Sequence, residues 1–160
     1  MRRVAPIVLS VVAAACTGPG ANQGDFNLDK QIDQEPDDNQ VDSTDATMCV
    51  AGDGTIYAAW IDDRSNFKDV WFTSSVDGGT TFDAPTQVKR ANGDASGLSM
   101  ACSGDHVFLA WEDTRDSETG YQNIYVNYSN DGGVGWRDED IRLDDDPQGR
   151  YISLSPQIVI

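Results

Sequence analysis

The sequence predicts an all-β protein made of repeated four-stranded antiparallel sheets, of the kind that form the blades of a β-propeller. Three observations lead to this class. Segments such as TIYAAWI and HVFLAWE alternate in polarity and are rich in β-branched and aromatic residues. No segment of useful length shows the helical spacing of apolar residues. The phrase SSVDGGTTF at 74–82 returns as YSNDGGVGW at 128–136, 54 positions later, which indicates a structural repeat.

The two halves of the chain align so that each contains four expected strands. These lie around 45–50, 55–61, 69–75 and 81–89, and then around 98–102, 106–112, 123–129 and 135–143. We therefore expect blade 1 at 45–90, blade 2 at 97–143 and the first strand of a blade 3 at 153–160. A propeller needs about 4–8 blades, so these are about two and a half blades of an incomplete propeller. The remaining blades are expected from a longer chain or from other copies of this one.

A blade exposes two apolar faces, which neighbouring blades must cover. We expect the large aromatic side chains to lie between the sheets: Trp60, Trp71 and Tyr57 in the first, and Trp111, Phe108 and Tyr125 in the second.

The N-terminus has the features of an export signal. Residues 1–15 carry two arginines, an apolar run and small residues, which is typical of a signal peptide. The stretch AAAC is similar to a bacterial lipobox and predicts lipidation of Cys16, followed by a linker at 16–44 that becomes acidic. Thr17 favours the outer membrane or cell surface. The alternative is an ordinary signal peptide with Cys16 incidental.

The formal charge of −16 limits the partners. Loss of the signal removes two arginines and no acid, which leaves 9 − 27 = −18. Such a surface repels nucleic acid and anionic lipid, so we expect no nucleic-acid partner and membrane contact only through the lipid. We expect no cofactor, with calcium as the alternative. The phrase DFNLDKQID begins like a calcium loop, but Lys30 and Pro36 stand where that loop needs glycine and a bidentate acid.

Cys49 and Cys102 occupy similar places in the two repeats, in MCVAG and ACSG, and Ile158 takes this place in the partial third repeat. An exported protein can form a disulfide between them. Small buried strand residues explain all three positions and are the favoured interpretation, with the disulfide as the alternative that the sequence leaves open.

The repeated phrase fits S-x-D-x-G-x-T-[FW]. It comprises Ser75, Asp77, Gly79, Thr81 and Phe82, and then Ser129, Asp131, Gly133 and Trp136, with Gly135 in the threonine place. It resembles the Asp-box, the bacterial neuraminidase repeat of sialidase-like propellers. Asp-Gly favours a tight turn, and the carboxylate can accept backbone N–H bonds across it. We therefore expect these residues to be structural turns and assign no catalytic residue.

A second repeated pattern, W-x-D-x-R, comprises Asp62 and Arg64, and then Asp113 and Arg115. The resembled family binds substrate on the face opposite the Asp-boxes, where the loops 62–69, 89–97, 112–122 and 144–151 are expected. These four residues and Arg150 are candidates for a ligand-binding rim. The other interpretation is that each Asp–Arg pair is structural, and the repetition of the same pattern in successive blades favours this structural role.

The resemblance implies that a sialidase needs three arginines, a Tyr–Glu pair, an acidic Asp and an [FY]-R-I-P phrase. That phrase does not occur in residues 17–160. The favoured function is therefore an exported, lipid-anchored propeller that binds a glycan or a surface protein. The alternative is an exo-sialidase or related glycoside hydrolase whose catalytic set is completed by further blades.

Overall fold

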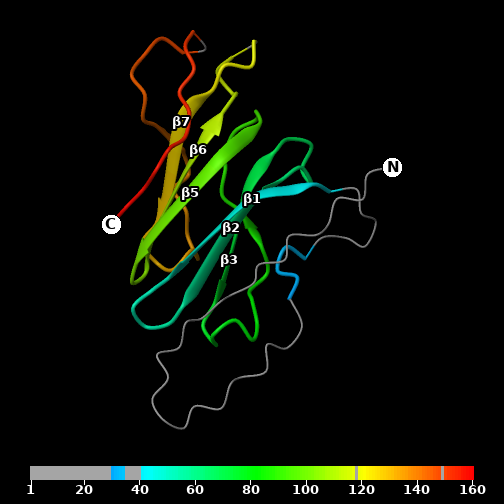
Figure 1. Cartoon of the computed structure of the whole chain (residues 1–160), viewed down its shortest axis with the longest axis vertical. Helices are drawn as coiled ribbons and strands as arrows, with labels where there is room; N and C mark the ends of the chain where they lie inside the picture. Colours follow the sequence, from blue (N-terminus) through cyan, green and yellow to red (C-terminus); the bar gives the residue numbers. More distant parts are fainter. Residues whose placement is uncertain (1–29, 35–40, 118, 149) are drawn as a thin grey trace.

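The computed structural model describes residues 30–34, 41–117, 119–148 and 150–160, and this part of the chain is all-β, without a helix. The strands are β1 (Ser43–Val50), β2 (Ile56–Asp62), β3 (Asp69–Ser75), β4 (Thr86–Gln87), β5 (Ala95–Ser103), β6 (His106–Asp113), β7 (Asn123–Ser129) and β8 (Ile141–Arg142). They form two four-stranded antiparallel sheets, β1-β2-β3-β4 and β5-β6-β7-β8 (Figure 1). The predicted all-β class is confirmed.

The outer strands β4 and β8 are much shorter than the predicted strands at 81–89 and 135–143. In the first sheet, Pro85 has no N–H to donate, which limits the ladder. Single backbone bonds continue the pairing on both sides of β4, from Asp83 N to Ser74 O and from Val88 N to Val70 O. The outer edge is therefore in the predicted place, but only a short part of it is regular strand.

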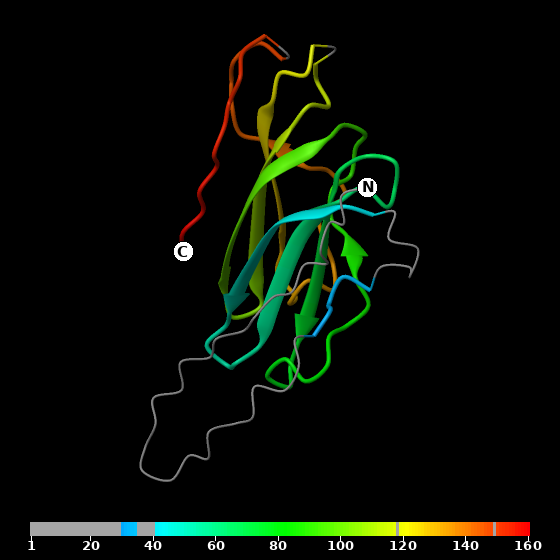
Figure 2. The ribbon, with the colours of Figure 1, turned by 45° about the vertical axis from the view of Figure 1, so that its right-hand side comes forward.

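The two sheets pack face to face, and Figure 2 shows them as separate layers. Most of the contact between them is made by β1 and β5. The buried core between the sheets includes Tyr57, Ile61, Val70 and Phe72 from the first sheet and Val107, Leu109, Trp111 and Tyr125 from the second. Each sheet thus covers one apolar face of the other.

Trp60 is buried, but not between the two sheets as predicted. Its neighbours Ala59 and Ile61 face the second sheet, so Trp60 points to the opposite side of the first. There it packs with Ile32, which is only 5% exposed, and with the half-buried Trp71. Part of the expected acidic linker therefore covers the outer face of the first sheet.

Phe108 also lies outside the core between the sheets. It is half-buried and stacks on Tyr128 of the neighbouring strand, with ring centroids 5.4 Å apart.

Cys49 and Cys102 form a disulfide with their Cα atoms 6.0 Å apart. Their positions are not equivalent, contrary to the sequence alignment. Cys49 lies opposite Tyr57, whereas Cys102 lies opposite Val107, which corresponds to Ile56. One step of register turns a side chain to the other face of its sheet. The two sulfur atoms therefore lie on the facing sides of the two sheets. Cysteines at equivalent positions would both point the same way and could not meet.

A bulge interrupts the first strand of each sheet at the equivalent place. The register shifts between Thr44 and Thr47 in β1 and between Ser96 and Ser99 in β5. Each bulge contains a left-handed residue, Asp45 with φ 50° and Gly97 with φ 59°. The Gly97 N–H donates a 2.9 Å hydrogen bond to Asp45 Oδ2, so a carboxylate of the first sheet holds the bulge of the second.

Residues 150–160 run beside the second sheet (Figure 1) and repeat this arrangement. Ser155 has φ 58°, and its N–H donates a 2.8 Å hydrogen bond to Glu112 Oε1. The carboxylate comes from a different position this time, because the bulge residue of the second sheet, Gly97, has no side chain. The Glu112 carboxylate occupies the space beside Gly97 instead. Residues 153–160 form no strand in the described part of the chain, which offers this segment no partner strand, so the first strand of a blade 3 stays a prediction. Cys49 lies four residues after the left-handed residue Asp45, and Val159 lies four residues after Ser155. Val159 rather than Ile158 therefore corresponds to Cys49.

The predicted signal peptide 1–15, Cys16 and most of the linker lie outside the described residues. In the part that the structure describes, no helix is long and apolar enough to cross a membrane.

Candidate functional site

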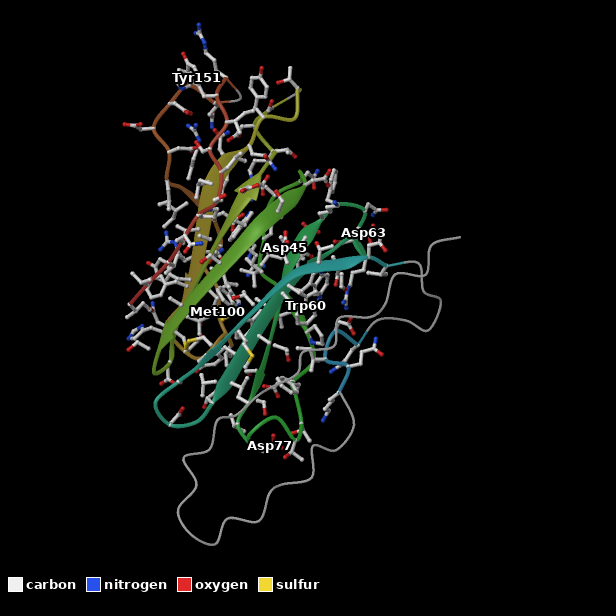
Figure 3. All side chains as sticks on the ribbon, in the orientation of Figure 1. Asp45, Trp60, Asp63, Asp77, Met100 and Tyr151 are labelled. Atoms are coloured by element: carbon white, nitrogen blue, oxygen red, sulfur yellow. A yellow bond between two sulfur atoms is a disulfide. The ribbon has the colours of Figure 1, made fainter. Side chains whose placement is uncertain are left out.

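The two sheets present two opposite ends. In Figure 3, Asp77 marks the end that carries the Asp-Gly turns, and Asp63 and Tyr151 mark the other end, which carries the β2–β3, β4–β5 and β6–β7 connections. We call these the turn end and the loop end. They follow from the meander topology, in which alternate connections lie at opposite ends of the sheet.

At the turn end, Asp77 is fully used in bonding its own turn. Its Oδ1 accepts hydrogen bonds from Thr81 N at 2.8 Å and from Ser75 Oγ at 2.9 Å. Its Oδ2 accepts from Thr81 Oγ1 at 2.7 Å, and Ser75 Oγ in turn accepts from Gly79 N at 2.9 Å. The N–H of Thr81 is the main cause that lowers the pKa of Asp77 to about 2. The carboxylate is therefore charged and structurally engaged at neutral pH.

The second turn has the same pattern with one bond fewer. Asp131 Oδ1 accepts from Gly135 N at 2.8 Å and from Ser129 Oγ at 2.7 Å, and Ser129 Oγ accepts from Gly133 N at 2.9 Å. Gly135 stands where the first turn has a threonine, so the hydroxyl bond is missing. The N–H of Gly135 lowers the pKa of Asp131 below its usual value.

The aromatic residues that end the two turns lie in different surroundings. Trp136 packs edge-on against Phe72 of the first sheet, with ring centroids 5.0 Å apart, and so contributes to the core between the sheets. Phe82 packs instead on the outer face of the first sheet, in the cluster around Trp60 and Ile32.

At the loop end, the three named residues of the first W-x-D-x-R pattern bond to one another through the aspartate. The buried Asp62 accepts from Trp60 Nε1 at 2.8 Å and from Arg64 Nη2 at 2.5 Å. The guanidinium of Arg64 stacks over Trp71 at 4.4 Å and donates to Asp33 O at 2.8 Å. The pair therefore ties the loop to the outer face of the sheet.

The second W-x-D-x-R pattern repeats this bonding within the core between the sheets. Asp113 is buried and accepts from Trp111 Nε1 at 2.9 Å and from Arg115 Nη2 at 2.7 Å. Arg115 also pairs with the buried Asp140 at 2.7 Å and lies 3.9 Å from the ring centre of Tyr125.

Two of the three arginine side chains of the predicted rim thus have little free surface. Arg64 is 17% exposed and Arg115 is 10% exposed, and both are bound to carboxylates. Arg150 is exposed and lies at the loop end, 5.9 Å from the ring centre of Tyr151. The three arginines contact different residues: Asp62 and Trp71, then Asp113 and Asp140, and lastly Tyr151.

A pocket of about 480 Å³ lies at the loop end, between the β2–β3 loop and the segment that follows β4. Its wall includes Asn66, Phe67, Gln87, Arg90 and Asn92, and it opens to solvent. Both segments belong to the loops that the sequence predicted to face a ligand, 62–69 and 89–97.

A buried ion pair forms the base of this pocket. Lys89 is buried, and its Nζ donates to Asp69 Oδ1 at 2.7 Å and to the carbonyls of Ala91 and Gly93, both at 2.6 Å. Asp69 Oδ2 accepts from Gln87 Nε2 at 2.9 Å and from the hydroxyl of Ser65. All donors of the ammonium are thus used, so the pair fixes the two loops and leaves neither charge free for a ligand.

Other polar groups of the pocket are free to bind a ligand. In the part of the chain that the structure describes, the side chains of Asn66 and Asn92 make no hydrogen bond, and neither do the Nη atoms of Arg90. Phe67 is 37% exposed beside them. Sequence reasoning named the loops but missed these residues, because an isolated Asn or Phe in a polar loop has no pattern that distinguishes it.

Among the described residues, no group of three or more His, Cys, Asp or Glu side chains is placed to hold a metal ion.

Comparison of the chain with known protein families and with curated proteins finds no match.

Proposed function

We propose that this chain belongs to an exported, lipid-anchored protein of the Asp-box propeller type, and that its two sheets are adjacent blades. Two observations support this proposal. The same Ser–Asp–Gly bonding closes the third connection of each sheet. Left-handed bulge residues recur at positions 45, 97 and 155, each of the later two bound by a carboxylate of the preceding unit. The pattern suits units that are added one after another around an axis.

We propose further that the loop end binds a glycan. The pocket carries this proposal, because it combines an exposed aromatic ring with amide groups that have no partner in the described protein. An aromatic ring can cover the apolar face of a sugar, and amides can bond its hydroxyl groups. The Asp–Gly turns lie at the other end, and their polar groups are already bonded.

The sialidase alternative receives less support from the described part of the chain. Its mechanism needs arginines that are free to bind a substrate carboxylate. Arg64 and Arg115 are held instead by Asp62 and Asp113, and both aspartates are fully buried.

Export is supported by the disulfide, because such bonds persist in oxidising compartments and are rare in the cytosol.

A Cys16→Ser variant tests the lipid anchor. It should move the protein from the membrane fraction to the soluble exported fraction, as judged by fractionation. Unchanged membrane association would refute the anchor.

The glycan proposal is tested with the full chain, purified from membranes in detergent and applied to an array of immobilised glycans. We expect capture by at least one class of terminal sugar, and competition by the same sugar in solution. A chain that is folded, as its disulfide and melting transition can show, but that captures no glycan would overturn the proposal.

A further inference from the structure

We propose that the pocket beside Phe67 binds an uncharged hexopyranose, with the apolar face of the sugar ring on the phenyl ring. This inference rests on the proposed glycan binding and adds to it the class of ligand and the residues that hold it. It is carried by three features of the pocket: the exposed ring, the unpaired polar groups around it and the distribution of charge.

The ring of Phe67 is presented by a constrained loop. Asn66, the residue before it, has φ 80°, and its N–H donates a 3.2 Å hydrogen bond to Asp63 O. Lys68, the residue after it, donates its N–H to Asp94 Oδ1 at 3.1 Å. Lys89 Nζ lies 5.8 Å from the ring centre. A bulky apolar side chain that is held at the mouth of a pocket and still exposed suits a ligand with an apolar face.

The free polar groups suit hydroxyl groups rather than an ion. An amide presents both a donor and an acceptor, so Asn66 and Asn92 can each bond a hydroxyl as acceptor or donor. The Nη atoms of Arg90 can donate to a further hydroxyl oxygen. Its Nε lies 3.4 Å from Arg137 O, which leaves the outer part of the guanidinium to the pocket.

The net charge of the chain, rather than the charges of the pocket wall, disfavours an anionic sugar. Lys89 is neutralised by Asp69, so Arg90 provides the free positive charge of the pocket wall. The backbone N–H of Arg90 donates to Asp140 Oδ2 at 3.0 Å, and that carboxylate is itself paired with Arg115. The chain as a whole carries −16, and a field of this sign lowers the local concentration of anions. An uncharged ligand does not encounter this repulsion.

The experiment measures the dissociation constants of methyl glycosides of glucose, galactose, mannose and N-acetylglucosamine, with glucuronic and sialic acids as charged comparisons. Binding to the full chain is followed by calorimetry at about 0.01 M and about 1 M ionic strength, where the Debye lengths are about 30 and 3 Å. We expect at least one neutral glycoside to bind with a dissociation constant that is the same at both ionic strengths. We expect the acids to bind more weakly.

The variants Phe67→Ala and Phe67→Trp test the position of the sugar. Alanine should weaken binding about tenfold or more, and tryptophan should retain it, because it restores an aromatic face. Tyr151→Ala is the matched control, since Tyr151 is a 53% exposed aromatic residue at the same end but outside the pocket. Arg90→Gln should weaken binding several-fold, whereas Arg150→Gln should leave it unchanged. Equal melting temperatures establish that each variant is folded.

Two results would overturn this inference and leave the proposed function standing. One is glycan binding that Phe67→Ala does not weaken, which would place the ligand elsewhere. The other is preferred binding of an acidic sugar that weakens in salt, which would refute the uncharged class. Failure of the chain to bind any sugar would refute both this inference and the proposed glycan binding.

Discussion

The two Asp–Gly turns provide a matched pair of substitutions, Gly79→Ala and Gly133→Ala, whose effects on stability should differ strongly. Both glycines have left-handed backbone, with φ 86° and 90°. Both N–H groups donate to the serine of their own turn at 2.9 Å. The backbone strain that alanine introduces should therefore be similar, about 1–2 kcal/mol at each position.

The surroundings of the new methyl group differ. At Gly79 the nearest atom would be Ile56 Cδ1 at 3.6 Å, an ordinary contact. At Gly133 the methyl would lie 2.0 Å from Phe72 Cε1, in the core between the sheets. Phe72 is confined by Tyr57 and Trp136, with ring centroids 5.9 and 5.0 Å away. Forcing the ring to move should add about 1–3 kcal/mol, as overpacking does. We expect a loss of about 2–5 kcal/mol for Gly133→Ala and about 1–2 for Gly79→Ala.

The measurement is the free energy of unfolding from equilibrium urea titrations of both variants. A second variant, Phe72→Ala, separates the two effects. In its background Gly133→Ala should lose its excess cost, because the clashing ring is gone, while Gly79→Ala should be unchanged. Equal destabilisation by the two glycine substitutions in the original chain would show that the second turn does not press on the first sheet as described.

Three further predictions concern the disulfide, the turn carboxylate and the bulge contact. Replacing Cys49 and Cys102 by alanine should lower the free energy of unfolding by up to about 4 kcal/mol, because the bridge joins residues 53 apart in sequence; a loss near zero in urea titrations would contradict this. The pKa of Asp77, about 2, lies below its ordinary value of 3.8, so its stabilisation is present above about pH 4 and lost toward about pH 2. Asp77→Asn should therefore reduce the fall of the urea midpoint across this range, and an unchanged fall would refute the assignment. Glu112→Ala should speed hydrogen exchange at the Ser155 amide, whereas Glu112→Gln, which keeps an acceptor, should change it less; equal exchange in both variants would contradict the contact.

The candidate pocket lies between loops that the sequence named, but its free polar groups were not predicted. The loops 62–69 and 89–97 were expected at the ligand end, and the pocket lies between them. The rim candidates Arg64 and Arg115 are bound to the aspartates of their own patterns, as the structural interpretation of the repeat expected. Spacing in the sequence showed that Asp and Arg recur together, but it could not show whether the arginine turns inward or outward. That choice depends on Trp71 and Tyr125, which provide rings for the guanidinium groups to stack on.

By itself, the sequence determined the all-β class, the repeat and the strands β2, β3, β6 and β7, because alternation and turn residues act over a few neighbouring positions. Tertiary structure alone decided what each face meets. It placed Trp60 under Ile32 rather than between the sheets, and it set Cys49 one register step from equivalence with Cys102, so that the two could join. These outcomes depend on which strands pair, in which register, and on which segment covers an open face, and segments far apart in the chain decide all of these together.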